Sequence, residues 1–262
     1  MKPDYKNWMP KGMVLGTLAG TLGSLLLFFV LGCTHLLSGK LKTVLFVTFL
    51  ILTVILALVT LWMTLMYRAF SYNGKRQMSK QIIEGIAEYV TIPDGGKGLD
   101  VGCGSGALTI AAAKRNPNAS LCGIDRWGKE YASFSKTLCE SNAAAEGVAN
   151  VAFRQGDATH LKYPDESFDA VMSNYVYHNI PSKDRQAILL ETLRVLKKGG
   201  TFALHDIFSK SKYGDMQSFV QKLRSQGYEQ VELVDTTNGK FISPFEATWM
   251  ELSGSALLVG KK

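Results

Sequence analysis

A glycine-rich stretch near the middle of the chain constrains the fold most strongly. It follows a short apolar run and reads Gly98-Leu99-Asp100-Val101-Gly102-Cys103-Gly104-Ser105-Gly106-Ala107-Leu108. Alternate glycines allow a sharp backbone turn and the close approach of a ligand. A helix that begins after the turn presents free N–H groups and the positive end of its dipole to that ligand. The stretch therefore predicts a strand, a nucleotide-type binding loop and a helix within an α/β sheet.

Strand and helix patterns alternate around and after this loop. Short apolar strands are expected at 98–101, 120–124, 151–155, 169–173 and 201–205. Helices are expected between and after them at 107–115, 129–146, 183–195 and 215–226, and two last strands at 230–234 and 254–259. This alternation is typical of a doubly wound parallel sheet, so the predicted fold class is α/β and Rossmann-like.

Two long uncharged runs precede the sheet. Residues 12–37 contain no formally charged side chain apart from the titratable His35, and residues 43–67 contain none. As helices they would be about 39 and 37 Å long, whereas the hydrocarbon core of a bilayer is roughly 30 Å thick. A signal peptide is the alternative for the first run, but its apolar core is usually only about 7–15 residues long.

We therefore expect a transmembrane helical hairpin before the sheet. The predicted organisation is a membrane anchor over 1–70, a basic linker with a leading helix over 71–96, and the main domain over 97–262. Small residues spaced by four, Gly12, Gly16, Gly20 and Ser24, share one face of the first span and allow another helix to approach closely. That helix is either the second span or the same span of a second copy, in a homodimer through Gly12, Gly16 and Gly20.

Positive charge is concentrated beside the two runs. Residues 1–80 hold nine Lys/Arg and one acid, whereas residues 81–262 hold 20 Lys/Arg and 21 acids, so the net charge of +7 comes from the first part. The nearly neutral main domain argues against nucleic-acid binding. The only basic residues between the two runs are Lys40 and Lys42. The other basic residues of the first part flank the outer ends of the runs. We therefore expect a multi-pass protein of the cell membrane with both termini and the main domain in the cytoplasm.

A carboxylate is placed suitably for a nucleotide ribose. Asp125 ends the second expected strand and is followed by Arg126. In sheets of this kind an acid at that place accepts hydrogen bonds from the ribose hydroxyls. Such a contact suits a dinucleotide and other adenosine cofactors equally, so it does not by itself name the cofactor.

The glycine pattern fits two kinds of cofactor. Gly102-x-Gly104-x-x-Ala107 matches the dinucleotide fingerprint. Gly102-x-Gly104-x-Gly106, with Asp100 before it, resembles motif I of the class I S-adenosylmethionine (SAM) dependent methyltransferases. Bare patterns of this kind are weak, so the residues downstream decide between them.

Three further motifs resemble the methyltransferase family. Gly156-Asp157-Ala158 follows the third strand, residues 163–171 resemble the lead into strand four, and residues 195–201 resemble the turn into strand five. Together with the glycine loop they cover about residues 97–206 in the family's order, and they are most similar to the ubiquinone and menaquinone biosynthesis methyltransferases. The resemblance implies a seven-stranded sheet with an antiparallel last strand and SAM as the cofactor. The hairpin departs from it, because those soluble enzymes lack one.

The resemblance also implies particular contacts. The carboxylate of Asp157 is expected to accept a hydrogen bond from the adenine amino group, while the neighbouring backbone meets the ring. No metal ion is expected. The expected cofactor contacts are Asp100, Gly102, Cys103, Gly104, Ser105, Gly106, Asp125, Arg126, Gly156, Asp157, Ala158, Ser173 and Asn174.

The residues after strand four lie at the carboxyl edge of the sheet, where such folds bind ligands. His178 is the candidate general base, because an imidazole changes charge near neutral pH; the alternative is a histidine that only shapes the loop. Tyr175, Tyr177 and His178 are expected to line the acceptor, unless they serve loop packing. His205 and Asp206 are neighbours on strand five and point to opposite faces, so they are not expected to act as one pair.

The predicted function is a membrane-anchored SAM-dependent methyltransferase that acts on a small, apolar or lipid-like acceptor at the cytoplasmic surface. An anchor raises the effective concentration of the enzyme toward an acceptor dissolved in the membrane. Two alternatives of other classes stay open at this point: a SAM-binding sensor or regulatory module without turnover, and an NAD-dependent oxidoreductase.

Overall fold

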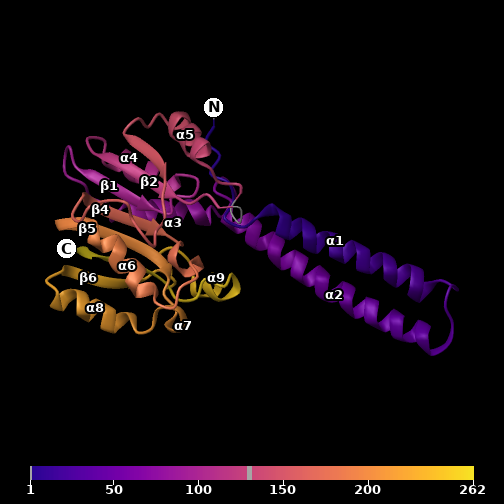
Figure 1. The fold of residues 1–262 in the computed structure, drawn as a ribbon. Coiled ribbons are helices and arrows are strands. Elements are labelled where there is room, and N and C mark those ends of the chain that lie inside the picture. Colours follow the sequence, from indigo (N-terminus) through magenta and orange to yellow (C-terminus); the bar gives the residue numbers. More distant parts are fainter. Residues whose placement is uncertain (1, 129–131) are drawn as a thin grey trace. The chain divides into compact units, whose positions relative to one another are not determined.

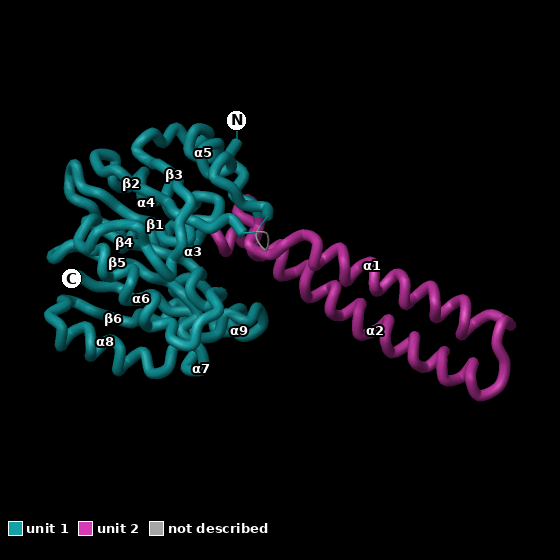
Figure 2. Tube along the Cα trace, viewed as in Figure 1, with its two compact units in different colours: residues 1–6, 80–262 teal, residues 7–79 magenta. Residues whose placement is uncertain are grey.

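The computed structural model describes residues 2–128 and 132–262 (Figure 1). The chain divides into two compact units, which Figure 2 distinguishes by colour. One unit is residues 7–79, and the other combines residues 2–6 with residues 80–262. The first residues, which the sequence assigned to the anchor, therefore belong to the same unit as the sheet.

The unit of residues 7–79 is a helical hairpin. α1 (Lys11–Leu27) continues into the π-helical turn η1 (Phe28–Cys33), and α2 (Gly39–Phe70) returns beside it. Both helices are long and apolar enough to cross a membrane, with mean hydropathies of 2.2 and 3.0. The predicted spans need correction at their ends, because the first ends before residue 37 and the second extends beyond both of its expected limits.

The small-residue face of α1 packs only partly on α2. Ser24 Oγ and Thr53 Oγ1 lie 2.9 Å apart, and a Cβ added to Gly20 would lie 3.7 Å from a leucine of α2. A Cβ added to Gly12 or Gly16 would meet no described atom within 4 Å. The close approach to the second span is therefore observed at Gly20 and Ser24 and not at Gly12 or Gly16.

The other unit contains a mixed sheet, in which the described strands follow the order β3-β2-β1-β4-β5-β7-β6. The strands in chain order are β1 (Lys97–Val101), β2 (Ser120–Asp125), β3 (Val151–Gln155), β4 (Phe168–Asn174), β5 (Leu196–Ile207), β6 (Glu229–Asp235) and β7 (Ser255–Lys261). The first five are parallel, and β7 is antiparallel to both of its neighbours. The predicted seven-stranded α/β, Rossmann-like fold is confirmed.

Helices connect and cover these strands (Figure 1). The described helices of this part are α3 (Met78–Ala87), α4 (Ala107–Arg115), α5 (Lys136–Ala145), the 3₁₀ turn η3 (Tyr177–Asn179), α6 (Arg185–Arg194), α7 (Lys210–Tyr213), α8 (Met216–Ser225) and α9 (Pro244–Trp249). α4 contacts β1 and β2, α5 contacts β3, α6 contacts β5, and α8 contacts β6. The short elements η3, α7 and α9 were not predicted, because a turn or two carries no readable hydrophobic period.

The helix predicted over 129–146 starts later than expected. The hydroxyl of Ser135 accepts the Leu138 N–H at 3.1 Å, which is a helix N-cap, so α5 begins one residue after Ser135. Residues 129–131 of that prediction lie outside the described residues.

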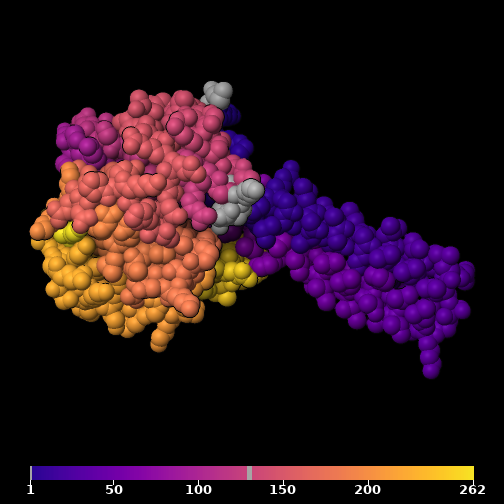
Figure 3. Space-filling model, in the orientation of Figure 1, coloured from indigo at the N-terminus to yellow at the C-terminus, as the bar shows by residue number. Residues whose placement is uncertain are grey.

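Alternation along the strands assigns side chains to the two faces of the sheet. Leu99 and Val101 are fully buried in a core that they share with α6 and α8. Asp100, between them, points to the other face, where the Thr109 hydroxyl of α4 donates to its Oδ2 at 2.6 Å. In the strand order, β1, β2 and β3 lie on one side of β4, and β5, β6 and β7 lie on the other. Figure 3 accordingly shows the surface of the earlier residues of the domain (magenta) on one side and that of the later residues (orange to yellow) on the other.

Candidate active site

The glycine loop leaves β1 and enters α4 with a backbone that favours glycine. Gly102, Gly104 and Gly106 have φ angles of +77°, +56° and +80°. A Cβ added to Gly102 would lie 2.3 Å from Val176, whereas the nearest described atom to one added to Gly104 would be that of Phe134 at 3.7 Å. Packing therefore requires glycine at 102, and the backbone at 104 is open to a ligand beside the N-terminus of α4.

Asp125, at the end of β2, fastens this loop. Its Oδ2 accepts the Gly104 N–H at 2.9 Å, and its Oδ1 accepts the Trp127 N–H at 2.7 Å. The Trp127 indole N–H in turn donates to the Gly104 carbonyl oxygen at 3.0 Å. Each carboxylate oxygen can accept a second hydrogen bond, so capacity for ribose hydroxyls is retained. Asp125 lies where the sequence predicts, and Trp127 joins the same site although no motif contained it.

Asp100, Cys103 and Ser173 support the loop from beneath. Burial raises the pKa of Asp100 to about 7, against the effect of the bond from Thr109. Burial also raises the pKa of the Cys103 thiol. The Ser173 hydroxyl donates to the Val101 carbonyl oxygen at 2.7 Å inside the sheet. These predicted cofactor residues shape the loop, and their side chains are buried beneath its surface.

The turn after β3 joins the same edge. The Gly156 N–H donates to the last main-chain oxygen of β2 at 3.0 Å. Asp157 is exposed, and its Oδ1 accepts the N–H and the hydroxyl of Thr159 at 2.8 and 2.7 Å, which lowers its pKa. The ionised carboxylate keeps acceptor capacity for an adenine amino group. Arg126 is exposed and attracts this carboxylate electrostatically, and Ala158 is buried.

The amide oxygen of Asn174 is directed toward β5. Its Oδ1 accepts a hydrogen bond from His205 Nδ1 at 2.8 Å, and His205 Nε2 lies 3.0 Å from Thr236 Oγ1. Burial lowers the pKa of His205 to about 3, so its ring is neutral at physiological pH. The Tyr175 hydroxyl lies 2.8 Å from Ser255 Oγ. Paired polar groups thus fill this part of the sheet edge.

Tyr177 occupies the core. Its side chain is fully buried, and its hydroxyl lies 3.0 Å from Thr192 Oγ1 on α6. Burial raises the pKa of this phenol. The structure therefore places Tyr177 among the packing residues, in contrast to the acceptor-lining role expected from its place after strand four.

His178 is paired with a buried carboxylate. Its Nδ1 lies 2.5 Å from Asp206 Oδ1, and its main-chain N–H donates to Asp206 Oδ2 at 3.2 Å. The Tyr177 N–H donates to the same oxygen at 2.8 Å. The side chain of Asp206 is fully buried, whereas that of His178 is 14% exposed. With Nδ1–H donating to Asp206, the ring presents Nε2 as the nitrogen that accepts a proton.

The pairing of Asp206 with His178 was not predicted from the sequence. The expectation that His205 and Asp206 face opposite ways is confirmed, since one meets Asn174 and the other meets His178. The strand order contains the information that predicts this pairing. β4 and β5 are adjacent parallel strands, and Asn174 lies opposite His205 in their register. Residues that follow β4 are therefore brought beside residues that end β5.

Two further cations hold the loop after β4. Arg185 Nε donates to the Tyr177 carbonyl oxygen at 3.3 Å, and its Nη1 donates to the Ser182 carbonyl oxygen at 3.0 Å. Lys212 Nζ donates to the His178 carbonyl oxygen at 3.3 Å. The His178 backbone is thus fixed from α6 and α7 as well as by Asp206.

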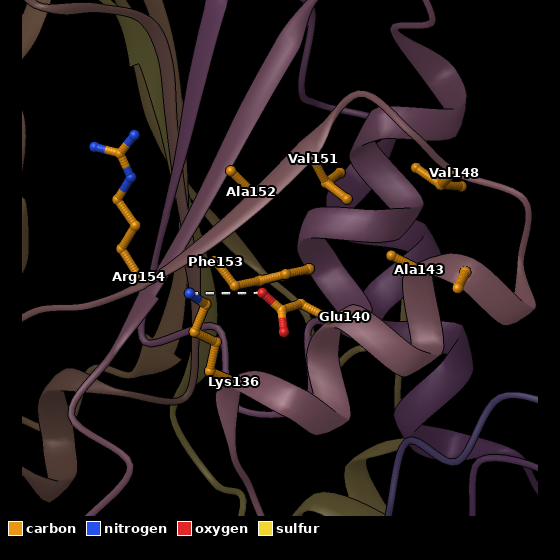
Figure 4. A pocket seen from close by; sticks show the side chains of 9 residues that line it. Lys136, Glu140, Ala143, Val148, Val151, Ala152, Phe153 and Arg154 are labelled. Atoms are coloured by element: carbon orange, nitrogen blue, oxygen red, sulfur yellow. Dashed lines mark ion pairs between the residues drawn. The ribbon is translucent and has the colours of Figure 1, made fainter.

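A separate hollow of about 450 Å³ lies between α5 and β3. Figure 4 shows Val151 and Phe153 extending from β3 toward α5, with Arg154 directed away from it. Lys136 and Glu140 form an ion pair at its rim, 3.6 Å apart. None of the predicted site residues lines this hollow.

The sheet order with its reversed last strand, the glycine loop and the acid after β2 define a SAM-binding methyltransferase fold. A methyltransferase-domain family matches residues 92–248, which is more than half of the chain. The chain belongs to this family of SAM-dependent methyltransferases. This finding favours the SAM interpretation of the glycine pattern over the dinucleotide one.

Named relatives agree with this assignment. A demethylmenaquinone methyltransferase of Lactobacillus johnsonii is 31% identical over 155 residues, which is 55% of this chain and 61% of that protein. An arsenite methyltransferase of Aquipseudomonas alcaligenes is 34% identical over 126 residues, 47% of this chain and 36% of that protein. The chain thus spans less than two thirds of the length of these curated relatives.

Solved structures share the fold at lower identity. The [4+2]-cyclase SpnF has a TM-score of 0.54 and 20% identity, covering 73% of this chain and 85% of its own. A geranyl diphosphate methyltransferase in complex with GPP and sinefungin has a TM-score of 0.55 and 14% identity. The match covers 74% of this chain and 81% of that one. At these identities the likeness concerns the fold.

Proposed function

We propose that this protein is anchored in the cell membrane by its hairpin and transfers a methyl group from SAM to a small, apolar or lipid-like acceptor at the cytoplasmic surface. The observation that carries the proposal is the hairpin itself. Large apolar side chains on both helices are exposed, among them Leu22, Leu26, Ile51 and Leu58 at 54–62%. A water-soluble protein rarely exposes so continuous an apolar surface.

Hydroxyl groups inside the hairpin are hydrogen-bonded within the protein, as groups surrounded by lipid must be. Thr21 Oγ1 and Thr60 Oγ1 lie 3.0 Å apart across the two helices. The Thr17 and Thr64 hydroxyls donate to carbonyl oxygens of the preceding turn of their own helices. Hydroxyls satisfied within or between helices are typical of membrane spans, where no water completes their bonding.

The division of the chain supports a two-span topology. Residues 2–6 and 80–262 form one compact unit, and the hairpin of residues 7–79 is inserted between them. If the helices cross the membrane, the chain must enter and leave it on the same side. The positive flanks of the hairpin indicate that this side is the cytoplasm, where SAM is made.

Relatives suggest the class of acceptor. The Lactobacillus johnsonii protein is named for demethylmenaquinone, a quinone, and the geranyl diphosphate enzyme acts on a prenyl diphosphate. Anchoring would concentrate this enzyme toward such apolar molecules within the bilayer. We therefore place the acceptor in the class of quinones, prenyl compounds or lipids. A homodimer through Gly12, Gly16 and Gly20 stays a proposal, supported by the uncovered faces of Gly12 and Gly16.

The residues of the site suit this reaction. SAM supplies the methyl group on a positively charged sulfur, and the acceptor atom displaces that sulfur in line. Asp125 would hold the ribose and Asp157 the adenine amino group. His178 Nε2 would take the proton of the acceptor, while the Asp206 carboxylate stabilises the imidazolium that forms.

A topology experiment tests the anchored arrangement. We expect a reporter fused after Lys262 to be protected from an external labelling reagent, as a cytoplasmic domain is. In a chain carrying Cys33→Ser, which removes the exposed native thiol nearby, a cysteine-reactive probe that does not cross membranes should instead label a cysteine placed at Leu36, between the helices. The control is the same fusion in permeabilised cells, where both positions should react. External labelling of the reporter in intact cells would contradict the proposal.

A further inference from the structure

The segment before the hairpin belongs to the methyltransferase unit and packs within it. Residues 2–6 belong to the compact unit of residues 80–262. Tyr5 is 3% exposed, and its hydroxyl donates to Glu146 Oε1 at 3.2 Å. Glu146 also pairs with Lys114 at the end of α4. We call residues 2–6 the strap.

One buried amide joins the strap to the glycine loop. Asn142 of α5 is 2% exposed. Its Oδ1 accepts the Asp4 N–H at 2.7 Å, and its Nδ2 donates to the Asp4 carbonyl oxygen at 3.1 Å. The same Nδ2 donates to the Ser105 carbonyl oxygen at 3.0 Å. Both Nδ2 hydrogens and Oδ1 are therefore engaged, two of these bonds with the strap and one with the loop.

The glycine loop needs such support, because it contains three glycines in left-handed conformations. Glycine gives an unbound loop many accessible backbone states, and ordering them on ligand binding weakens affinity. Ser105 lies between Gly104 and Gly106 and is itself 5% exposed. A second bond from α5 reaches the loop at the neighbouring residue, where Cys139 Sγ lies 3.2 Å from the Gly104 carbonyl oxygen. α5 thus fixes two successive carbonyls of the loop.

We propose that Asn142 is a positioning residue for the cofactor and that it needs the strap to hold the glycine loop. With residues 2–6 docked, Asn142 holds the Ser105 carbonyl, and the loop binds SAM tightly. When the strap is displaced, Asn142 loses two of its three bonds, becomes accessible to water and no longer fixes the loop. This inference rests on the proposed cofactor-binding role of the glycine loop. It makes SAM affinity depend on a segment more than 95 residues away in the sequence.

The strap acts through its backbone, which allows a matched pair of variants. Asp4→Pro removes the N–H that Asn142 Oδ1 accepts, whereas Asp4→Ala keeps that N–H and the carbonyl oxygen. Asp4→Ala loses an exposed ion pair with Lys6, which contributes little to stability, and the acceptor of the Lys6 N–H. Asp4→Pro loses the same two side-chain contacts. The two variants therefore differ in the hydrogen bond from the main-chain N–H of residue 4 to Asn142 Oδ1.

The dissociation constant of SAM, measured by calorimetry on the full chain in detergent micelles, tests the proposal. We expect Asn142→Ala and Asp4→Pro each to weaken SAM binding about 5- to 30-fold, and the double variant to be no weaker than Asn142→Ala alone. Asp4→Ala should bind as the unaltered chain does. Equal affinities of Asp4→Pro and Asp4→Ala would overturn the role of the strap.

Asp125→Ala, titrated in parallel, separates two kinds of failure. If it weakens SAM binding while Asn142→Ala does not, the loop is the cofactor site and Asn142 does not position it. If neither variant changes the affinity, the cofactor assignment of the loop is itself wrong. Thermal unfolding of each variant, followed by circular dichroism, identifies any affinity loss that comes from unfolding, which would count against a positioning role.

Discussion

Replacing Asp125 by alanine is expected to weaken SAM binding about 10- to 100-fold. The change removes the acceptor of the Gly104 N–H and the Trp127 N–H, and with it the proposed contacts with the ribose hydroxyls. Hydrogen bonds to a charged group contribute about 1.5–3 kcal/mol each, and about 1.4 kcal/mol corresponds to a factor of ten in affinity. Isothermal titration with SAM measures the effect.

Asp125→Asn is the matched control for this prediction. It keeps one oxygen that can accept the Gly104 N–H, but it loses the charge, so we expect an affinity between those of the alanine variant and the unaltered chain. An Asp125→Ala variant that binds SAM as tightly as the unaltered chain would remove Asp125 from the cofactor site.

Replacing His178 by alanine is expected to lower kcat by about 10²- to 10⁴-fold, the usual contribution of a positioned general base. SAM affinity should stay unchanged, because the described hydrogen bonds of His178 are to Asp206 and Lys212, and none of them joins it to the glycine loop. Steady-state kinetics with radiolabelled SAM gives kcat, and calorimetry gives the affinity.

Asp206→Asn tests how His178 is held. Asparagine keeps an acceptor for the Tyr177 and His178 N–H groups, but it no longer carries the charge that stabilises an imidazolium. We expect a reduced kcat whose dependence on pH differs from that of the unaltered enzyme, with SAM binding intact. Full turnover of His178→Ala would show that methyl transfer needs no base at this position and would leave the histidine a role in loop shape.

Much of the fold was predictable because its signals are local. Apolar runs of strand length alternate with helical periods after residue 97, and all seven predicted strands are present within a few residues of their expected ends. The reversed direction of β7 is not a local property, and it came from the family resemblance. The helix ends of the hairpin were less accurate, because a long apolar sequence carries no cap or charge that marks where a span ends.

The candidate site was predictable where a motif is contiguous and less so where the fold joins distant residues. The glycine turn after β1 and the position of Asp125 at the end of β2 could be predicted from local patterns. The contact between His178 and Asp206 depends on β4 and β5 being neighbours, and the bonds between Asp4 and Asn142 join residues 138 positions apart. Tyr177 illustrates the opposite error, because a position next to a catalytic edge does not reveal that the hydroxyl reaches Thr192 inside the core.

Methyl transfer into a membrane lipid extract tests the central proposal most directly. The full chain is reconstituted in vesicles containing the extract and supplied with SAM labelled on its methyl group. The comparison protein joins residues 2–6 to residues 80–262 through a flexible linker in place of the hairpin, so that the strap is kept. We expect label in the organic phase, more with the hairpin than without it, and at least about 100-fold slower labelling with His178→Ala. No organic-phase label from a protein that still binds SAM would contradict a lipid-like acceptor and would favour a soluble acceptor or a SAM sensor.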